Sequence, residues 1–473
     1  MRAFTFKGLF LTAVFMLLGC LSIQAADDDL ITKQITIKLD EAGTLPDRIG
    51  SSRKYQITNL KLVGEINGTD LRMIREMAGS DYYGGSTEGN LSVLDLSEAK
   101  IVIGGGDCFN GYSCYTSNDV IGNRAFSGCS RLTSLTLPAS ITRIGDDAFC
   151  CCSGLTSLTL PAGITEIGYG AFWGCSGLTS LNLPAGITSI GDDAFYGCSG
   201  LTSITLPAGI TEIGGSAFNG CSRLTSLTLP AGITSIGGGA FYGCSGLTSL
   251  NLPAGITEIG GGAFGFCSGL TSINLPAGIT SIGEYAFYGC SGLTSVTLPA
   301  GITEIGECAF YGCSGLTSLT LPAGLTQIDD YAFSECSGLT SMYVYAEKVP
   351  KIGEDVFTGC DAKKCTVYVP KGTYDDYWLS DFGYFENIVE FDATGIDKTT
   401  TSTDVKEVSR YSVNGQRLVG PTKGLNIVKY SDGSVKKVAV EIDGSQYLKS
   451  QYLRITNHRV TVRKKRISLS EHL

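Results

Sequence analysis

Residues 155–177 read LTSLTLPAGITEIGYGAFWGCSG, and units of the same 23-residue length and pattern follow one another from residue 132 to residue 345. Ten leucines share one column of this repeat: Leu132, Leu155, Leu178, Leu201, Leu224, Leu247, Leu270, Leu293, Leu316 and Leu339. Phe149, Phe172, Phe195 and their successors share a second column. A pattern that returns at such a fixed period is typical of a solenoid, in which each repeat is one rung.

One rung is too small to fold alone. Its apolar positions are Leu155, Leu158, Leu160, Ile164, Ile167, Ala171 and Phe172. Each such side chain contributes ~1.5 to 3 kcal/mol when it is buried, whereas ordering the chain costs at least ~1 kcal/mol per residue. We therefore expect the rungs to stack, so that neighbours cover each other's apolar side chains.

The quoted rung divides into three segments. Residues 157–160 alternate polar and apolar side chains, which predicts a strand with one buried face. Pro161 ends this strand, and residues 160–163 fit a type I turn with proline in its second position. Residues 164–167 are expected to form a second short extended segment, and residues 168–175 a tight helical or 3₁₀ turn.

The pattern LxxLxLPxxIxxIxxxAFxxCxx resembles the bacterial leucine-rich repeats of the surface-antigen type named after BspA. The resemblance covers about residues 91–370. It implies a right-handed leucine-rich-repeat β-solenoid, poor in helix, with a parallel sheet along one face and short 3₁₀ or helical turns. Relatives of this type are surface antigens, and some attach to host matrix proteins.

The first residues have the features of a secretory signal. Arg2 and Lys7 precede an apolar stretch that runs to Ile23, and Ala25 offers a cleavage site before three aspartates. We expect residues 1–25 to be a signal peptide and the mature chain to be exported, to the cell surface, the outer membrane or the extracellular space. Residues 17–20 resemble a lipobox, so lipidation of Cys20 is a competing prediction. No later stretch reaches the ~18 to 20 apolar residues that span a bilayer.

Less regular sequence flanks the rungs. Residues 26–90 are expected to form an N-terminal cap and residues 91–392 the solenoid. The apolar sets Ile57, Leu60, Leu62 and Leu91, Leu94, Leu96 fit degenerate strands, and residues 365–370 fit a closing strand. Residues 97–131 break the phase and should project as a loop. Cys108 and Cys114 in that loop either form a disulfide, as exported proteins allow, or remain two thiols.

The composition changes again towards the C-terminus. Residues 393–404 are rich in Ser and Thr and fit a flexible linker. Residues 405–440 fit a small β module with hairpin turns at Asn414-Gly415 and Asp432-Gly433. This module resembles the C-terminal sorting modules of proteins that Bacteroidetes export by the type IX route. Such modules usually end the chain, whereas here a basic extension, residues 441–473, follows.

Charge and histidine content exclude several functions. The net charge of −10 and the pI near 4.9 have the wrong sign for a nucleic-acid partner. His458 and His472, the two histidines, lie in the C-terminal extension, so neither a histidine triad nor a histidine-bearing catalytic metal site fits the solenoid. An enzyme would need a carboxylate pair in the irregular segment, which offers Asp107 and Asp119. We expect a protein without enzymatic activity and without a cofactor.

Cysteine forms a column of its own. Its members are Cys129, Cys152, Cys175, Cys198, Cys221, Cys244, Cys267, Cys290, Cys313 and Cys336. Rungs ~4.8 Å apart would bring neighbouring thiols near disulfide range, but parallel side chains disfavour the bond. We predict a ladder of buried thiols, with a metal or redox ladder as the alternative. Cys150, Cys151 and Cys308 lie outside the column and follow no usual metal spacing.

Carboxylates recur in two patterns. The pairs 146–147, 192–193 and 329–330 precede the Ala-Phe segment and are expected to cap its helical turn, with loose Ca²⁺ binding as the alternative. In the second extended segment glutamate alternates with a neutral residue, as in Glu212, Ser235 and Glu258. Stacking would then hold the glutamates two rungs apart, which limits their repulsion.

Aromatic side chains supply the candidate binding surface. One column, after each Ala-Phe pair, carries Trp173, Tyr196, Tyr242, Tyr288 and Tyr311; Tyr343 and Tyr345 interrupt the small polar residues of the main strand. Packing within the repeat is the alternative role of these rings. Neighbouring rungs hold Asn, Gly or Ser in the column, so we expect partial exposure, and exposed tyrosines make good contact residues.

Two functions fit these observations. In the first, the protein is an exported surface for binding or adhesion to a protein or glycan of a host or of neighbouring bacteria. In the second, it is a stiff structural spacer or coat that displays the C-terminal module. An ice-binding face is disfavoured, because asparagine interrupts the Ser-Leu-Thr pairs of the main strand.

Overall fold

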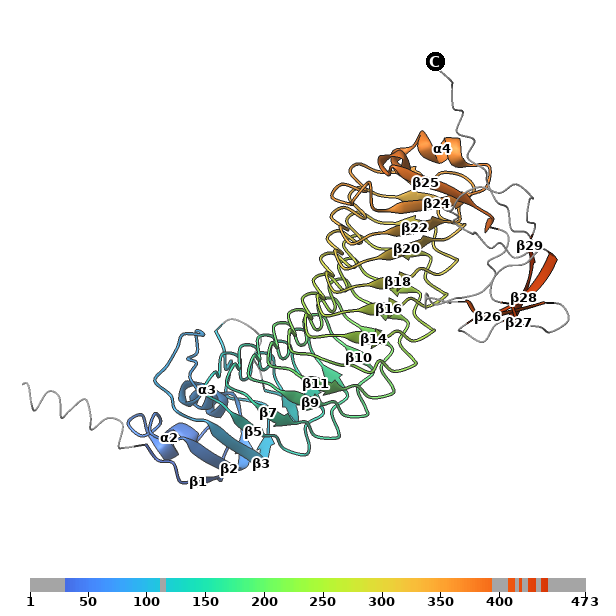
Figure 1. Cartoon of the computed structure of the whole chain (residues 1–473). Helices are drawn as coiled ribbons and strands as arrows, with labels where there is room; N and C mark the ends of the chain where they lie inside the picture. Colours follow the sequence, from blue (N-terminus) through green and yellow to red (C-terminus); the bar gives the residue numbers. More distant parts are fainter. Residues whose placement is uncertain are drawn as a thin grey trace, which may run out of the picture. The chain divides into compact units, whose positions relative to one another are not determined.

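The repeats stack in register as a parallel β-solenoid (Figure 1). The structure is a computed structural model that describes residues 30–110 and 116–393 and four strands between residues 407 and 440. Ser180 pairs with Ser203, Leu181 with Ile204 and Asn182 with Thr205, so equivalent residues of successive rungs lie side by side. The predicted fold class is confirmed.

The regular rungs contribute to two parallel series of strands, although the rung of residues 224–246 forms a strand in the second series alone. The main series, with its flanking strands, comprises β1 (Ile35–Leu39), β2 (Asn59–Ile66), β3 (Val93–Ile101), β5 (Ser134–Thr136), β7 (Ser157–Thr159), β9 (Ser180–Asn182), β11 (Ser203–Thr205), β14 (Ser249–Asn251), β16 (Ser272–Asn274), β18 (Ser295–Thr297), β20 (Ser318–Leu321), β22 (Ser341–Val344), β24 (Thr366–Pro370) and β25 (Asn387–Phe391). The second series comprises β4 (Val120–Ile121), β6 (Arg143–Ile144), β8 (Glu166–Ile167), β10 (Ser189–Ile190), β12 (Glu212–Ile213), β13 (Ser235–Ile236), β15 (Glu258–Ile259), β17 (Ser281–Ile282), β19 (Glu304–Ile305), β21 (Gln327–Ile328) and β23 (Lys351–Ile352).

Apolar columns fill the interior of the solenoid. The phenylalanines of the Ala-Phe pairs, from Phe126 to Phe333, are fully buried and stack with ring centres 5.2–5.5 Å apart. The leucines and isoleucines of both strand series are buried around them. The rungs therefore share one continuous core, as the repeat predicts.

The cysteine column is a ladder of buried thiols, as predicted. From Cys152 to Cys336, each Sγ donates to the carbonyl oxygen of a phenylalanine in the preceding rung, over 3.0–3.2 Å. Burial raises the pKa of Cys198 to about 12, and the other thiols of the column are shifted in the same direction. These side chains stay protonated at neutral pH, and each adds a second hydrogen bond to a carbonyl oxygen that already accepts a backbone N–H, as Phe149 O does from Cys152.

Two turns link the segments of a rung. Ile164 N–H donates to Pro161 O over 3.2 Å, so the turn spans residues 161–164, one residue later than predicted. In residues 168–175, Trp173 N–H donates to Gly170 O, whereas Phe172 N–H donates to Ala194 O of the next rung. The predicted tight turn is thus a series of 3₁₀-type turns that alternate with bonds between rungs rather than a continuous helix.

The carboxylate pairs cap the next rung instead of a helix in their own. Asp146 Oδ1 accepts Tyr169 N–H, Asp192 Oδ1 accepts Gly215 N–H, and Asp330 Oδ1 accepts Glu354 N–H, over 2.6–3.0 Å. The predicted role of these aspartates as caps of a helical turn in their own rung is therefore wrong, because the N–H groups that they accept belong to the next rung. The second strand series places Ser235 between Glu212 and Glu258, which confirms the predicted spacing of the glutamates.

The N-terminal cap combines β1–β3 with helices α2 (Leu45–Ile49) and α3 (Gly68–Met77), which the sequence analysis did not predict. Arg75 of α3 is fully buried, donates to Arg124 O and Ser80 Oγ, and lies over the Phe109 ring. Cys108 is disulfide-bonded. Cys114 lies outside the described residues, so its pairing with Cys108 stays a prediction.

The C-terminal end of the solenoid is closed by α4 (Tyr374–Trp378) and the 3₁₀ helix η1 (Asp381–Tyr384), beside β24 and β25. Tyr377 is buried and its hydroxyl donates to Ala346 O over 2.7 Å. Among the described residues, no helix is both long and apolar enough to cross a membrane.

A second unit includes residues from Glu390 onward. It contains β26 (Glu407–Ser412), β27 (Arg417–Leu418), β28 (Gly424–Tyr430) and β29 (Val435–Val440), paired as an antiparallel sheet in the order β27-β26-β28-β29. The two predicted hairpin turns, the residues before 30 that include Cys20, and the extension after Val440 lie outside the described residues.

Candidate binding surface

The third segment of each rung presents one outward side chain at a fixed place. Tyr242 lies three residues after Gly239 and directly before Gly243, and both glycines adopt positive φ, 63° and 70°. This left-handed conformation suits glycine because it lacks a Cβ. The two glycines turn the backbone sharply on either side of the tyrosine, whose own N–H is bonded to Gly239 O. Successive rungs repeat the geometry and align their outward side chains.

Five rings from four successive rungs form what we call the aromatic ridge: Tyr242, Phe266, Tyr285, Tyr288 and Tyr311. The ring centres of Tyr242 and Phe266 lie 5.3 Å apart, those of Phe266 and Tyr288 5.2 Å, and those of Tyr288 and Tyr311 5.0 Å. Tyr285 contacts Tyr288 at 5.8 Å. Tyr242, Phe266 and Tyr285 are 36%, 44% and 40% exposed, so the ridge is open to solvent although its rings touch.

A glycine makes room for the middle of the ridge. A Cβ on Gly265 would lie 2.6 Å from Cδ2 of the Tyr242 ring, so this ring covers the position where the column otherwise has a side chain. Phe266, one residue later, supplies the ring of that rung and adopts φ 55°, a conformation that costs ~1–2 kcal/mol outside glycine. Its contacts with Tyr242 and Tyr288 offset part of that cost.

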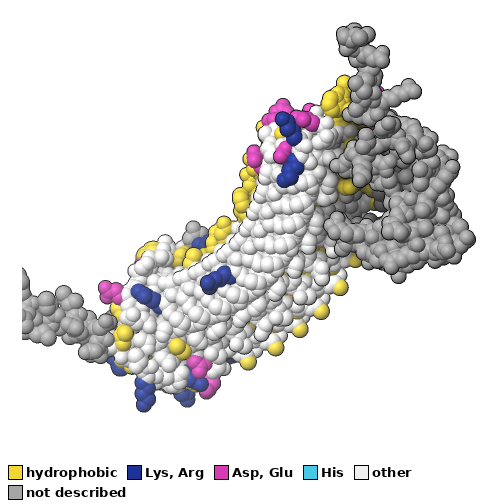
Figure 2. Space-filling view, viewed as in Figure 1, with side chains coloured by type: hydrophobic (Ala, Val, Ile, Leu, Met, Phe, Trp, Pro, Cys, Tyr) yellow, Lys and Arg dark blue, Asp and Glu magenta, His cyan; other side chains and the backbone are white. Residues whose placement is uncertain are grey.

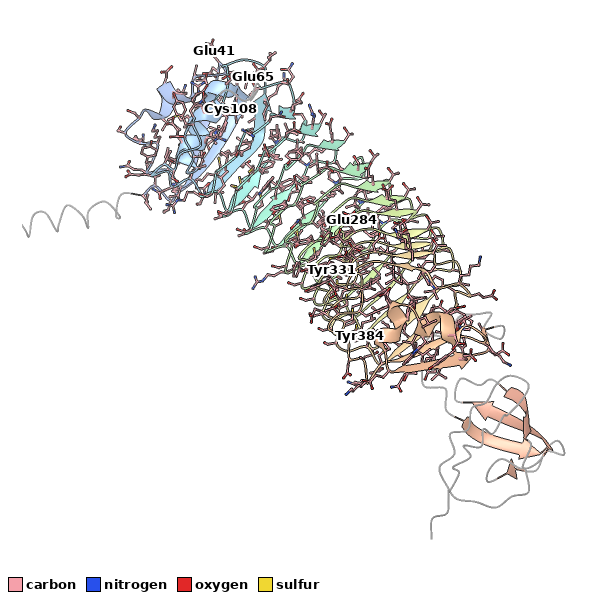
Figure 3. The ribbon with its side chains drawn as sticks, turned by 90° about the horizontal axis from the view of Figure 1, so that it is seen from above. Glu41, Glu65, Cys108, Glu284, Tyr331 and Tyr384 are labelled. Atoms are coloured by element: carbon pink, nitrogen blue, oxygen red, sulfur yellow. The ribbon has the colours of Figure 1, made fainter. Side chains whose placement is uncertain are left out.

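Carboxylates flank the ridge. The Tyr285 hydroxyl donates to Glu307 Oε1 over 3.1 Å, and this hydrogen bond is the main reason that the pKa of Tyr285 rises to about 12. Glu284, beside Tyr285 in sequence, is exposed. Figure 3 shows Glu284 and Tyr331 along the length of the solenoid, between Cys108 near one end and Tyr384 near the other. The ridge thus combines apolar rings, hydroxyl donors and negative charge.

The Tyr285 hydrogen bond has a measurable pH dependence. The pKa of Tyr285 in the folded protein lies above the ordinary value of 10. The stabilisation by this hydrogen bond is therefore complete below about pH 10 and is lost as the pH rises towards 12. In an alkaline titration followed by tyrosinate absorbance, we expect Tyr285→Phe to remove one tyrosine from the component that ionises near pH 12. A loss from the component near pH 10 instead would contradict this hydrogen bond.

The structure divides the seven predicted side chains into separate groups. Tyr242, Tyr288 and Tyr311 belong to the ridge. Trp173 and Tyr196 form another pair, with ring centres 4.7 Å apart, because Asn219 occupies the column between Tyr196 and Tyr242. Tyr343 stacks on Tyr368 of β24 at 4.5 Å, and burial raises the pKa of Tyr345. Tyr343 belongs to β22 of the main strand series and Tyr345 directly follows that strand, so neither ring belongs to the ridge.

The sequence analysis missed Phe266 and Tyr285. The signal for Phe266 is an inversion: the rungs on either side read Tyr-Gly-Cys where this rung reads Gly265-Phe266-Cys267. Tyr285 occupies the column of Gly239 and Gly262, where φ is positive, and nothing in the repeat indicates a ring there. Only the stacked rungs bring these two side chains beside the predicted column.

The main strand face is small, polar and uniform. Figure 2 shows few charged side chains over the middle rungs, whereas Lys, Arg, Asp and Glu gather towards the ends of the solenoid. An unbroken threonine column, which the analysis of the strand pairs overlooked, runs beside these strands. Thr179 Oγ donates to Thr156 O and Thr202 Oγ to Thr179 O, so these hydroxyls bond the rungs together.

The carboxylates of the described residues are the remaining candidates for a catalytic or metal site. Asp330, Glu354, Asp355 and Asp381 line an open hollow, but the described residues contain no group of three or more acidic, cysteine or histidine side chains placed to hold a metal ion. Asp119 accepts a hydrogen bond from Ser140 Oγ, whereas the backbone carbonyl of Asp107 accepts one from the Arg72 guanidinium. Neither arrangement indicates an acid–base pair.

A family model described as the BspA type leucine-rich repeat region matches the chain over residues 119–248, 165–281 and 257–375. These overlapping matches run from residue 119 to residue 375, more than half of the 473 residues. They include every rung that contributes to the aromatic ridge.

Several solved structures are similar to the chain. A leucine-rich repeat protein from Bacteroides ovatus matches 76% of this chain and 92% of its own, with 24% identity and a TM-score of 0.50, which shows the fold alone. A leucine-rich cell surface protein from Faecalibacterium prausnitzii matches 57% and 76%, with 29% identity and a TM-score of 0.37. The pneumococcal vaccine antigen PcpA matches 62% and 87%, with 20% identity and a TM-score of 0.39. No curated protein matches the chain.

Proposed function

The chain belongs to the BspA-type leucine-rich-repeat family, and from that premise we propose that it is an exported, non-catalytic surface protein that binds an extracellular protein through its aromatic ridge. The observation that carries the proposal is the ridge itself: five touching rings, partly exposed, on a solenoid whose main strand face is small and polar over most of its rungs. Tyrosine is enriched among the residues that dominate binding energy at protein interfaces.

Two features support export. The leader-type sequence of residues 1–25 has a basic start, an apolar stretch and a small-residue exit. Cys108 is disulfide-bonded, and disulfides persist in oxidising compartments. Lipidation of Cys20 and a sorting role of the C-terminal β module are two proposed means of attachment to the cell surface.

The arrangement of the rings favours a protein partner over a glycan. Tyr288 and Tyr311 are parallel to within 6°, so their faces cover each other and mainly ring edges and hydroxyls remain for a ligand. A sugar ring packs best on an open aromatic face, which a stacked ring does not offer. Ring edges and hydroxyls suit a protein surface, where apolar contact and hydrogen bonds occur together.

A structural spacer is the second candidate function. The near uniformity of the main strand face favours it, because all regular rungs but the last repeat a serine followed by threonine or asparagine, such as Ser157 and Thr159, and a shaped ligand site would break the pattern. In that role, the length of the solenoid would matter and the ridge would not.

The proposal is tested by measuring the binding of the mature chain to immobilised extracellular matrix proteins, mucins and whole cells of neighbouring bacteria. We expect binding to at least one of these probes. We also expect Tyr242→Ala/Phe266→Ala/Tyr288→Ala to weaken that binding by about thirtyfold or more, because truncating one dominant interface residue costs ~2 kcal/mol.

A matched triple variant controls for the number of substitutions. Asn182→Ala/Asn251→Ala/Asn274→Ala removes three exposed side chains from the main strand face and should leave binding within about twofold. Equal binding by both triple variants would exclude the ridge and favour the spacer. Absence of binding to every probe would count against the binding function altogether.

A further inference from the structure

Two neighbouring thiols, Cys150 and Cys151, lie outside the buried cysteine ladder. Cys151 is exposed and Cys150 half-buried, whereas Cys152, the next residue, is fully buried and belongs to the ladder. The two outer sulfurs are 3.5 Å apart. Cys151 occupies a column in which most rungs have glycine, and it adopts φ 59°. A non-glycine residue in this conformation is strained, and the exposed Cys151 side chain buries little surface in return.

The distance between the two sulfurs distinguishes a disulfide from a shared metal ion as the use of this pair. A disulfide requires sulfurs ~2.05 Å apart and α-carbons ~4.4 to 6.8 Å apart, whereas adjacent residues across a trans peptide have α-carbons only ~3.8 Å apart. A single ion at the usual thiolate–zinc distance of ~2.3 Å from both sulfurs would subtend about 100° at a sulfur separation of 3.5 Å, close to a tetrahedral angle. The pair as it stands therefore fits a shared ion without movement of the backbone.

We propose that Cys150 and Cys151 form a surface chelate for one thiophilic cation of the zinc class. Thiolates are the ligands that select such soft or borderline ions. Described residues supply no third cysteine, histidine or carboxylate in a metal-holding arrangement, so water or a group from another molecule completes the coordination. The site is open and its ion exchangeable.

Binding must displace two protons. One divalent ion and two thiols give the bis-thiolate complex and two protons, with no change of oxidation state. Burial, the neighbouring Cys151 and then Asp147 raise the pKa of Cys150 to about 12, while Ser127 opposes the shift, so the Cys150 thiol is protonated at neutral pH. Arg124 pairs with Asp147 over 3.0 Å and limits that negative charge. Affinity for the ion is therefore expected to increase with pH.

The ladder thiols do not compete for the ion. Cys152 and Cys175 are fully buried, donate to carbonyl oxygens and carry pKa values raised well above the ordinary value by burial. Cys308 also lies outside the ladder, but it is mostly buried and has no second thiol beside it among the described residues. It provides a matched control.

The test uses the mature chain, reduced with a phosphine and freed of metal, titrated with Cd²⁺ as the probe. We expect an ultraviolet sulfur-to-cadmium charge-transfer band that saturates at one ion per chain. Bound Cd²⁺ should also protect the Cys150 and Cys151 thiols from an aromatic disulfide reagent. Cys150→Ser and Cys151→Ser should each reduce the band by more than tenfold, while Cys308→Ser should retain it.

Circular dichroism of each variant verifies that the solenoid is folded, and the two single variants act as replicates if one of them folds poorly. A band of equal size in wild type and in both single variants would overturn the assignment. So would exposed thiols that react freely at saturating Cd²⁺. Failure of both Cys150 and Cys151 to be alkylated in the metal-free chain under the phosphine would show a disulfide between them in place of the chelate.

Discussion

Replacing Phe218 with alanine is expected to lower the free energy of unfolding by about 3–5 kcal/mol. Phe218 is fully buried and stacks between Phe195 and Phe241, with ring centres 5.4 and 5.5 Å away. Its removal leaves a cavity in a core that two neighbouring rungs share, and rungs held by their nearest neighbours cannot refill it. Chemical denaturation followed by circular dichroism measures the loss.

Phe266→Ala is the matched control. The same side chain is removed, but Phe266 is 44% exposed and lies in a strained conformation, so the expected change in stability is below about 1 kcal/mol. The two variants should therefore separate the roles of the two rings: Phe218→Ala destabilises the solenoid, whereas Phe266→Ala weakens binding. Equal losses of stability would contradict the placement of the phenylalanine columns.

Deleting one whole rung, residues 201–223, is expected to leave a folded protein. The deletion joins Gly200 to Leu224, so every remaining residue keeps its place in the 23-residue phase and equivalent residues still pair. We expect the far-ultraviolet circular dichroism per residue to be unchanged and unfolding to remain cooperative, because the stability of stacked repeats is roughly a sum over rungs and their interfaces.

Deleting half a rung, residues 201–212, should have the opposite effect. The chain can then no longer complete a circuit, so the strand of the next rung cannot lie beside the strand before the deletion. The solenoid is expected to split at that point. The variant should then bind a hydrophobic dye, and its unfolding should no longer be cooperative. A half-rung variant as stable as the whole-rung variant would refute the stacking in register.

The sequence predicts the fold well because one period determines both the strand register and the core. Leu155, Phe172 and Cys175 each repeat with the same spacing, so a single rung predicts which side chains are buried in all regular rungs. The turn at Pro161 was misplaced by one residue, since the hydrogen bond that defines it depends on backbone torsions that the pattern does not encode.

Prediction was weaker where the sequence leaves the period. Asn67 precedes α3 and caps it: its side chain accepts Thr69 N–H, and its own N–H donates to Asp70 Oδ2. This local signal does not follow the 23-residue period. The ridge was predicted only in part. Phe266 adopts a positive φ that non-glycine residues rarely take, so its position follows from contacts with Tyr242 and Tyr288 and not from the repeat.

We expect the ridge, and not the length of the solenoid, to determine binding. Two variants of equal length test it: deletion of residues 270–292 removes Tyr285 and Tyr288, whereas deletion of residues 201–223 removes a rung with Asn219 in the same column. Titration of both variants against the probe that the wild type binds should show at least a tenfold loss of affinity for the first and near wild-type affinity for the second. Equal affinities of the two shortened proteins would contradict the account.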